Sequence, residues 1–402
     1  MTHSDHSASP DYRVWQRDFV RIGARSYRVA TKPGVFAHGR GDPAAVMLAN
    51  NVVVNPGDHV MQLNCGSGLL GAVAAASGAA SVTLTDRNVL SYEAARRTLE
   101  SNDVANGTVL LSHGAHALPG GAGADTVAIR IPHERLAQLQ LLANAFRLLR
   151  VGGACYIAGA VNEGIKPATR ALERIFGAVR VLEHGSGHRV VRAIKLGDVP
   201  ADSEELAHPM LQQDTFQHVD ATLRGRPLTL HSRPGVFSWE HVDEATTLLA
   251  DHMIIAAGES VLDLGCGFGA LGTVAGLISG GAVCMVDADI EAVRSAGQTA
   301  RAAGLTSCRV LASDVTAAVH GEQFHVVVSN PPFHVGKATD LTVPKQFIDE
   351  SWEALVHGGS MQLVANRTLP YERMMQQRFG NIATVFDGPR FKVLRAVKRR
   401  SS

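Results

Sequence analysis

Short apolar runs alternate with amphipathic stretches through the second half of the chain. The apolar runs predict buried strands, and the stretches with apolar residues every three or four positions predict helices. Strands are expected at 261–264, 283–286, 309–312, 325–329, 361–365 and 391–397, and helices at 290–303 and 344–356. This alternation predicts an α/β fold with a mostly parallel, doubly wound sheet. Residues 219–223 and 228–231 predict a hairpin ahead of that sheet.

A motif near the start of the chain returns 201 residues later, because Lys32-Pro-Gly-Val-Phe36 recurs as Arg233-Pro-Gly-Val-Phe237. Further pairs at the same offset are Asp42 and Asp243, Cys65-Gly66 and Cys266-Gly267, and Asp86 and Asp287. A period this long is too large for a solenoid and is typical of a duplicated domain. The boundary is expected within the polar, acidic residues 196–216, which divides the chain into residues 1–200 and 201–402.

Composition narrows the class of protein. Hydrophobic residues make up 46% of the 402 residues, which is enough for large cores and excludes a disordered chain. The formal net charge is only +1, so nucleic-acid binding has to be argued from local patches. The five cysteines form no C-x-x-C motif, which argues against a disulfide framework and a zinc module and indicates a reducing compartment. No group of residues has the spacing of metal ligands, so we expect no metal.

One uncharged run, residues 264–286, is long enough to cross a bilayer. It contains seven glycines and is flanked by Asp263 and Asp287. A strand, a glycine-rich turn, a helix and a second strand therefore explain it better than a membrane span. The first residues of the chain have no apolar segment, so we expect no signal peptide.

A glycine-rich turn follows the strand at 261–264 and opens a helix. It reads Asp263, Leu264, Gly265, Cys266, Gly267, Phe268, Gly269. Its three glycines let the backbone turn tightly and approach a ligand. Asp287, followed by Ala288, ends the next strand, where a carboxylate can bind both hydroxyls of a ribose. Ser313-Asp314 ends the third strand and can reach an adenine amino group. Three such positions at successive strand ends predict a nucleoside cofactor.

The spacing of this turn favours S-adenosylmethionine (SAM) over NAD. NAD sites usually read G-x-G-x-x-G, because the pyrophosphate needs a free helix N-terminus. Here the spacing is G-x-G-x-G, and Asp263 precedes it. A carboxylate at that place would repel a pyrophosphate and pair with the ammonium group of SAM. The alternative is that Asp263 only caps the turn.

The candidate reaction site is Asn330-Pro331-Pro332-Phe333-His334, which ends the strand at 325–329. The Asn330 side-chain oxygen and the Pro331 carbonyl can both accept hydrogen bonds from one planar NH₂ group, and the prolines restrain the backbone that carries them. Catalysis would then consist mostly of orienting the amine toward a methyl sulfonium. Phe333 offers a face on which a base can stack. His334 would contact the substrate or order the loop.

These motifs resemble those of the class I SAM-dependent methyltransferases, and more narrowly those of the RsmC/RlmG group of ribosomal RNA guanine-N2 methyltransferases. The resemblance covers nearly the whole chain and is carried by the duplication, by Pro234-Gly235-Val236-Phe237-Ser238, by the turn at 263–269 and by Asn330-Pro331-Pro332-Phe333-His334. The N-P-P-F motif alone is shared with adenine-N6 and glutamine methyltransferases. The resemblance implies two tandem Rossmann-like domains in a cytoplasmic protein, with a catalytic second copy that binds SAM.

The resemblance also implies a decayed first copy that assists folding or RNA binding. The residues agree with that division. Asp263 is replaced by Gln62, and Gly265 is replaced by Asn64. The region matched to Asn330-Pro331-Pro332 reads Ile131-Pro132-His133, so the amide that would orient the amine is absent. We therefore expect no catalysis from the first copy.

Charge is divided between the copies. Residues 1–200 hold 21 Lys and Arg against 15 Asp and Glu, whereas residues 201–402 hold 17 against 22. Arg13, Arg17, Arg21 and Arg25 recur at every fourth position, so they would form one cationic stripe if this stretch were helical, although Gly23 weakens that expectation. The hypothesis is that the first copy holds RNA phosphates while the second takes in one flipped base.

The sequence therefore predicts a SAM-dependent methyltransferase that acts on the exocyclic N2 of a guanine in ribosomal RNA, with the small-subunit (16S) RNA as the main expectation. The duplication allows a monomer. Four alternatives stay open: a large-subunit rRNA guanine-N2 enzyme, an adenine-N6 or protein-glutamine methyltransferase, a non-catalytic RNA-binding assembly factor, and a dehydrogenase.

Overall fold

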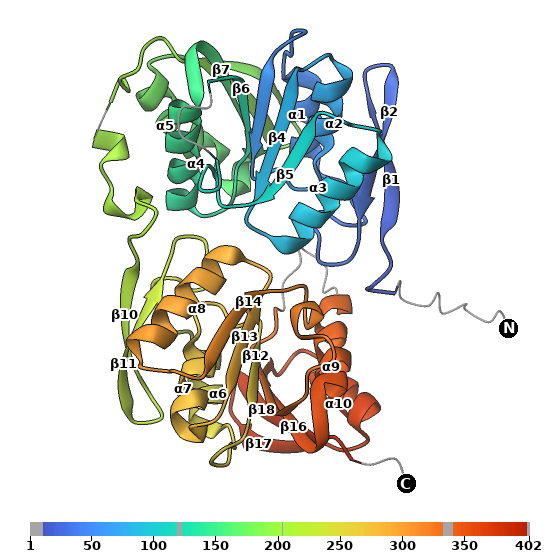
Figure 1. Cartoon of the computed structure of the whole chain (residues 1–402), viewed down its shortest axis with the longest axis vertical. Coiled ribbons are helices and arrows are strands. Elements are labelled where there is room, and N and C mark those ends of the chain that lie inside the picture. The colour runs from blue at the N-terminus through green and yellow to red at the C-terminus, as the bar shows by residue number, and fades with distance from the viewer. Residues whose placement is uncertain (1–10, 119–122, 203, 333–340, 400–402) are drawn as a thin grey trace, which may run out of the picture.

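The protein consists of two α/β units stacked end to end (Figure 1). The structure is a computed structural model that describes residues 11–118, 123–202, 204–332 and 341–399. Each unit contains a seven-stranded sheet and a separate two-stranded hairpin. The strand orders are β5-β4-β3-β6-β7-β9-β8 and β14-β13-β12-β15-β16-β18-β17, so the two sheets have the same topology.

The first unit contains β1 (Gln16–Ile22), β2 (Arg25–Thr31), α1 (Pro43–Asn51), β3 (His59–Leu63), α2 (Leu69–Ala76), β4 (Ser81–Asp86), α3 (Val89–Ser101), β5 (Gly107–Leu111), β6 (Ala124–Arg130), α4 (Arg135–Leu148), β7 (Leu149–Ala160), α5 (Ile165–Phe176), β8 (Val179–Gly185) and β9 (His188–Ile194). The second contains β10 (Gln217–Leu223), β11 (Arg226–Ser232), α6 (Glu244–His252), β12 (Val261–Leu264), α7 (Ala270–Ser279), β13 (Val283–Asp287), α8 (Ile290–Ala302), β14 (Cys308–Ala312), β15 (Phe324–Ser329), α9 (Thr342–Ala354), β16 (Leu355–Asn366), α10 (Tyr371–Phe379), β17 (Ala383–Asp387) and β18 (Phe391–Val397).

The fold predicted from the sequence is confirmed. Strands β12 to β16 run parallel, and β18 is antiparallel to β16. The strand at 391–397 does not close the sheet, because β17, which the sequence did not predict, pairs with its other side and forms the edge. The uncharged run at 264–286 forms the end of β12, the glycine-rich turn, α7 and most of β13. No helix within the described residues is long and apolar enough to cross a membrane. Strand β12 is central and at most 1% exposed in its apolar residues, because both faces of a parallel sheet are covered by helices.

The two copies pack around an internal pseudo-two-fold axis. The Val89 amide donates to the Ala288 carbonyl at 2.8 Å, and the Ile290 amide donates to the Arg87 carbonyl at 3.0 Å. The two bonds are equivalent, because Val89 corresponds to Ile290 and Arg87 corresponds to Ala288 at the offset of 201 residues. Asn88 and Asp289, which occupy equivalent positions, form an antiparallel bridge between them. The interface is therefore built like that of a symmetric dimer, within one chain.

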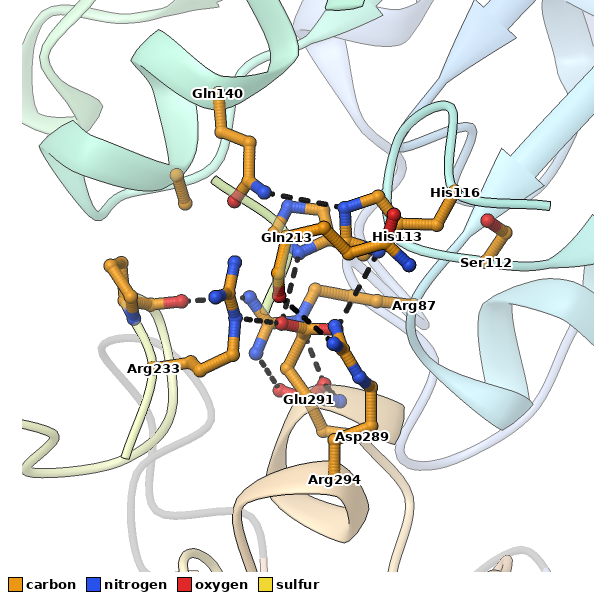
Figure 2. Close-up of polar contacts among 12 residues, drawn as sticks. Arg87, Ser112, His113, His116, Gln140, Gln213, Arg233, Asp289, Glu291 and Arg294 are labelled. Atoms are coloured by element: carbon orange, nitrogen blue, oxygen red, sulfur yellow. Dashed lines mark hydrogen bonds and ion pairs between the residues drawn. The ribbon is translucent and has the colours of Figure 1, made fainter. Parts of the chain in front are cut away.

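Charged side chains from both copies meet beside this axis (Figure 2). Arg87 forms a two-pronged ion pair with Asp289, with distances of 2.7 Å from Nε and 2.5 Å from Nη2. Glu291 is fully buried, lies 2.5 Å from Arg233 Nε and approaches His113 of the first copy at 3.7 Å. Burial opposes the ionisation of Glu291, but His113 and the guanidinium groups of Arg233 and Arg294 lower its pKa well below its ordinary value.

Candidate functional site

One cavity of about 450 Å³ lies at the carboxyl ends of β12, β13, β14 and β15. The chain order changes direction between β12 and β15, which is where open α/β sheets bind ligands. The cavity wall includes nearly all of the described residues that the sequence singled out for cofactor and catalysis. It also includes four residues of the first copy, which are Tyr12, Gly34, Asn88 and Leu90.

The glycine-rich turn forms one wall of the cavity. Gly265, Gly267 and Gly269 have φ angles of +75°, +53° and +84°, which favour glycine. A Cβ at Gly269 would lie 2.9 Å from the Cβ of Ala296, so this glycine also allows α7 and α8 to pack closely. Cys266 lines the cavity between these glycines, and burial raises the pKa of its thiol well above the ordinary value.

Asp263 lies beneath this turn rather than on the cavity wall. Its side chain is completely buried, and Oδ2 accepts a hydrogen bond of 2.7 Å from the Gly272 amide, while Oδ1 has no partner among the described residues. Burial raises its pKa to about 7, although the bond from Gly272 lowers it. The carboxylate thus ties the turn to α7, which corresponds to the capping alternative stated above.

Asp287 and Ala288 line the cavity at the end of β13. Asp287 accepts hydrogen bonds from the Gly267 amide and the Asp289 amide, both at 2.9 Å, so its carboxylate is held against the glycine-rich turn. Burial and the neighbouring Asp289 raise its pKa to about 6. The half-buried carboxylate is in the place where a ribose-binding acid is expected.

Asp314 is held by the first copy. Tyr12 Oη donates to Asp314 Oδ1 at 2.6 Å, and Lys32 Nζ forms an ion pair with Asp314 Oδ2. Lys32 is buried and lies 4.1 Å from the centre of the Tyr12 ring. Burial and the charge of Asp314 raise the pKa of Tyr12 far above its ordinary value, so the hydroxyl remains a donor. Ser313 is buried beside Asp314, and its hydroxyl donates to the Val315 carbonyl at 2.8 Å.

Asn330 lines the cavity at the end of β15. Its amide nitrogen donates to Asp243 Oδ2 at 3.1 Å and to Thr246 Oγ1 at 3.0 Å. Because Asp243 can only accept, these bonds determine which end of the amide is the oxygen. That oxygen is buried and has no partner among the described residues. Asn330 therefore presents an unused acceptor, which is the group required to orient an amine.

The sequence analysis did not assign Asp243 or Thr246 to the site. Asp243 begins α6 by accepting a hydrogen bond from the Thr246 amide at 3.0 Å, and its second oxygen reaches Asn330. The repeated pair Asp42 and Asp243 was the available signal, but the sequence analysis used it only as evidence of the duplication. Lys32 was likewise visible only as part of a repeat. Pro331 and Pro332 line the cavity, whereas Phe333 and His334 lie outside the described residues.

The expected helical stripe of arginines is wrong, because these residues belong to a hairpin. Arg17 and Arg21 lie on β1, and Arg25 begins β2 and donates to the Ala76 carbonyl. Arg13 precedes β1 and pairs with Glu353 at 2.8 Å. Arg17 and Arg21 share one face of β1, whereas Arg25 follows the turn at Gly23, which has a φ of +56°, and lies opposite Ile22 on the other face. The four residues therefore do not form one surface.

The counterpart of the cavity in the first copy has a volume of only about 20 Å³. Asn64 occupies the place of Gly265, and Arg87 occupies that of Ala288. Since both replacements put a larger side chain where the second copy has its ligand cavity, little space is left for a nucleoside.

The residue that replaces Asn330 in the first copy is Arg130. The sequence analysis had matched Asn330 with Ile131, which is one position too far along the chain. The sheet register decides this, because Val60 pairs with Thr126 on β6 as Val261 pairs with Val326 on β15. Arg130 forms ion pairs with Asp42 at 3.0 Å and with Glu163 at 2.7 Å. The first copy thus keeps the partner of Asn330 as Asp42 but uses it to neutralise a guanidinium.

The family model called methyltransferase small domain matches the chain twice, over residues 26–192 and 227–395. The chain belongs to the methyltransferase small domain family. A ribosomal RNA small subunit methyltransferase C of Pseudomonas entomophila is 32% identical over 275 residues, which are 68% of this chain and 79% of that protein. A protein of the same name from Chromohalobacter salexigens is 41% identical over 177 residues, which are 43% of this chain and 52% of that protein.

A solved structure matches nearly the entire chain. It is the T. thermophilus 16S rRNA N2 G1207 methyltransferase in complex with AdoMet and guanosine, with a TM-score of 0.80 and 28% identity, and it covers 96% of this chain and 98% of that one. The resemblance to the RsmC/RlmG group is therefore confirmed, as is the tandem class I methyltransferase fold.

Proposed function

We propose that this chain transfers a methyl group from SAM to the exocyclic N2 of a guanine in small-subunit ribosomal RNA. The observation that carries the proposal is the unused acceptor of Asn330, held in orientation by Asp243 and Thr246 at the cavity. The names of the relatives and of the T. thermophilus enzyme supply the base, the atom and the subunit. An RNA of the ribosome would place the reaction in the cytoplasm.

The cavity fits SAM because glycines form part of its wall and carboxylates at the strand ends can accept hydrogen bonds from the nucleoside. Gly265 and Gly267 leave the wall without side chains, and a Cβ at Gly265 would lie 3.2 Å from the Phe347 ring. Asp287 would hold the ribose hydroxyls, and Asp314 would accept from the adenine amino group. When bound, SAM supplies an electrophilic methyl group on a sulfonium centre. Asp263 would act by keeping the glycine-rich turn in place rather than by contact.

The residues at the end of β15 would orient the nucleophile. Asn330 Oδ1 and the Pro331 carbonyl would accept the two N–H groups of the guanine amine, so that its nitrogen faces the methyl carbon. The nitrogen would bond to the methyl carbon as the sulfur–methyl bond breaks, which leaves S-adenosylhomocysteine. The extra proton on the nitrogen would pass to water, so no general base is required. Because the work is orientation, we expect most of the rate enhancement to come from positioning.

The two copies would have separate roles. Residues 201–402 would carry the catalytic site, and residues 1–200 would be a non-catalytic unit that supports folding and RNA binding. The collapsed counterpart cavity and the replacement of Asn330 by Arg130 support this division. The residues of the first copy that line the main cavity support a further, local contribution to that site.

The test uses tritiated SAM with purified small and large ribosomal subunits from a strain deleted for this protein. The labelled RNA is digested to nucleosides and compared with that of the Asn330→Ala variant. We expect N2-methylguanosine from the small subunit, reduced at least a hundredfold in the variant. Label in N6-methyladenosine, or label only in the large subunit, would overturn the proposed substrate. Intact SAM binding with no label in either subunit would overturn the proposal for ribosomal RNA.

A further inference from the structure

We infer that the outer face of the hairpin β1–β2 binds a single-stranded segment of the RNA substrate beside the target guanine. This inference rests on the proposed function. Arg17, Phe19 and Arg21 alternate along β1 and therefore share one face, and Arg28 lies opposite Phe19 on β2. We call the face formed by Arg17, Phe19, Arg21 and Arg28 the arginine face.

The arginine face is exposed, whereas the opposite face of the hairpin is packed. Phe19 is 72% exposed, and the three arginines are exposed as well. On the other side, Ile22, Tyr27 and Val29 are buried in the core of the first unit. The hairpin lies at the edge of this unit, beside α3 (Figure 1). Packing therefore explains the buried face of the hairpin, whereas Phe19 on the other face is left in solvent.

The positive charge of this face is not neutralised by the rest of the protein. Arg21 Nε donates to the Gly23 carbonyl at 3.3 Å, and Arg28 Nη1 donates to the Ser101 carbonyl at 2.9 Å. These bonds hold the guanidinium groups without cancelling their charge. No ion pair joins Arg17, Arg21 or Arg28 to a carboxylate among the residues that the structure describes.

The duplication provides an internal comparison. Hairpin β10–β11 has the same register, and the positions equivalent to the arginine face carry His218, Asp220, Thr222 and Thr229. Thr229 donates to Asp220 at 2.6 Å, so that surface satisfies itself. A hairpin of this topology thus folds with no arginine and no phenylalanine at these four positions. The residues of the arginine face are consequently not required by the hairpin fold.

The chemistry of the arginine face matches single-stranded RNA. Guanidinium groups bind phosphates with release of counterions, and an exposed aromatic ring offers a stacking surface for an unpaired base. Its position agrees with this role. Tyr12 and Lys32 flank the hairpin at its base and contact Asp314 in the wall of the cavity. The seven-residue strands extend roughly 23 Å from there, at about 3.3 Å per residue.

The test exchanges the arginine face for its counterpart. The variant Arg17→His, Phe19→Asp, Arg21→Thr, Arg28→Thr carries the residues of the second hairpin at the same positions, so it should fold. We expect its Kd for small ribosomal subunits to rise at least tenfold. The slope of log Kd against log salt should fall by about 2, from roughly 0.7 for each of three lost phosphate contacts. SAM affinity and kcat at saturating subunits should not change.

Single variants separate the contribution of charge to RNA binding from that of stacking on Phe19. Phe19→Ala should weaken binding about tenfold at unchanged salt slope, whereas Phe19→Tyr should bind like the wild type. Arg226→Gln, which removes one exposed arginine from the second hairpin, should leave both Kd and slope unchanged. A photoreactive p-benzoylphenylalanine at position 19 should crosslink to 16S RNA within the subunit.

Two results would overturn the inference. One is an unchanged Kd and salt slope in the fourfold variant. The other is a crosslink from position 19 to a ribosomal protein, which would make the arginine face a protein contact. Both are distinguishable from failure of the proposed function, in which the wild-type protein would label neither subunit although it binds SAM.

Discussion

Lys32 of the first copy should control how well the cavity of the second copy binds SAM. The residue is buried, and its ammonium group pairs with Asp314, which lines the cavity. In Lys32→Met the side chain keeps nearly the same length, but Asp314 loses the cation. Tyr12 alone then holds the carboxylate, through the bond of 2.6 Å to Oδ1.

The expected losses of stability and of SAM affinity in Lys32→Met follow from the burial of the ion pair. Removing one partner of a buried ion pair costs about 3–5 kcal/mol, and a hydrogen bond to a charged group contributes about 1.5–3 kcal/mol. The Asp314 side chain is 23% exposed, so water can partly replace the ammonium group. We therefore expect a loss of about 2 kcal/mol in the free energy of unfolding. SAM affinity should fall roughly tenfold, or about 1.4 kcal/mol, because a carboxylate held only by Tyr12 is less well oriented toward the adenine amino group.

The assay compares binding of S-adenosylhomocysteine with that of S-inosylhomocysteine, which lacks the exocyclic amine. The wild type should prefer the adenosyl compound, and Lys32→Met should lose most of that preference while kcat at saturating SAM stays the same. Arg233→Lys is the matched control, since Arg233 occupies the equivalent position but pairs with Glu291, outside the cavity. It should reduce stability without changing cofactor affinity. If Lys32→Met lowers stability and leaves both affinities unchanged, the pair is only structural and the reasoning is refuted.

Three further predictions concern the cavity and the interface. Asp243→Asn keeps a good N-cap for α6 but places an N–H donor against the N–H donors of Asn330. The rate constant kcat should therefore drop about a hundredfold, or about 2.7 kcal/mol, at unchanged SAM affinity. An unchanged kcat in single-turnover assays would contradict this. Arg87→Ala breaks the two-pronged pair with Asp289 and should cost about 3 kcal/mol in chemical denaturation, while calorimetric titration should still give one SAM per chain. Burial and the charge of the neighbouring His113 lower the pKa of His116 to about 4. Between pH 6.5 and 4 the unfolded chain therefore binds more protons than the folded chain, so the free energy of unfolding should fall by up to about 3 kcal/mol as the pH drops through that window. In His116→Gln the fall should be smaller.

Most of the fold and the gathering of the candidate residues of the second copy at one cavity were predictable, because they depend on local rules. Buried strands of a parallel sheet give continuous apolar runs, and a turn that requires positive φ at three positions uses glycine. The carboxyl ends of neighbouring parallel strands meet at one edge, so Asp287, Asp314 and Asn330 converge although 43 residues separate the first from the last.

Contacts between the copies were not predictable in the same way. Nothing in the spacing of Tyr12 and Lys32 indicates that they reach Asp314, about 300 residues away, because the pseudo-two-fold packing is a tertiary property. The arginine spacing was ambiguous, since every fourth residue shares a face in a helix and in a strand. The counterpart of Asn330 was misplaced because the offset between the copies changes from 201 to 200 before β15, and only the sheet register shows it.

The pseudo-two-fold interface has a consequence for how this protein diversified. In a homodimer of identical subunits, one gene encodes both halves, so a substitution that improves one half appears in the other as well. Here the halves are encoded separately while their geometric relation is preserved by the bonds at Arg87, Val89, Ala288 and Ile290. Lys32 and Arg233 show the result, because equivalent positions now serve a cofactor cavity in one case and a buried interface carboxylate in the other. Because one chain carries both copies, equivalent positions can differ between them, and the copies stay together on dilution.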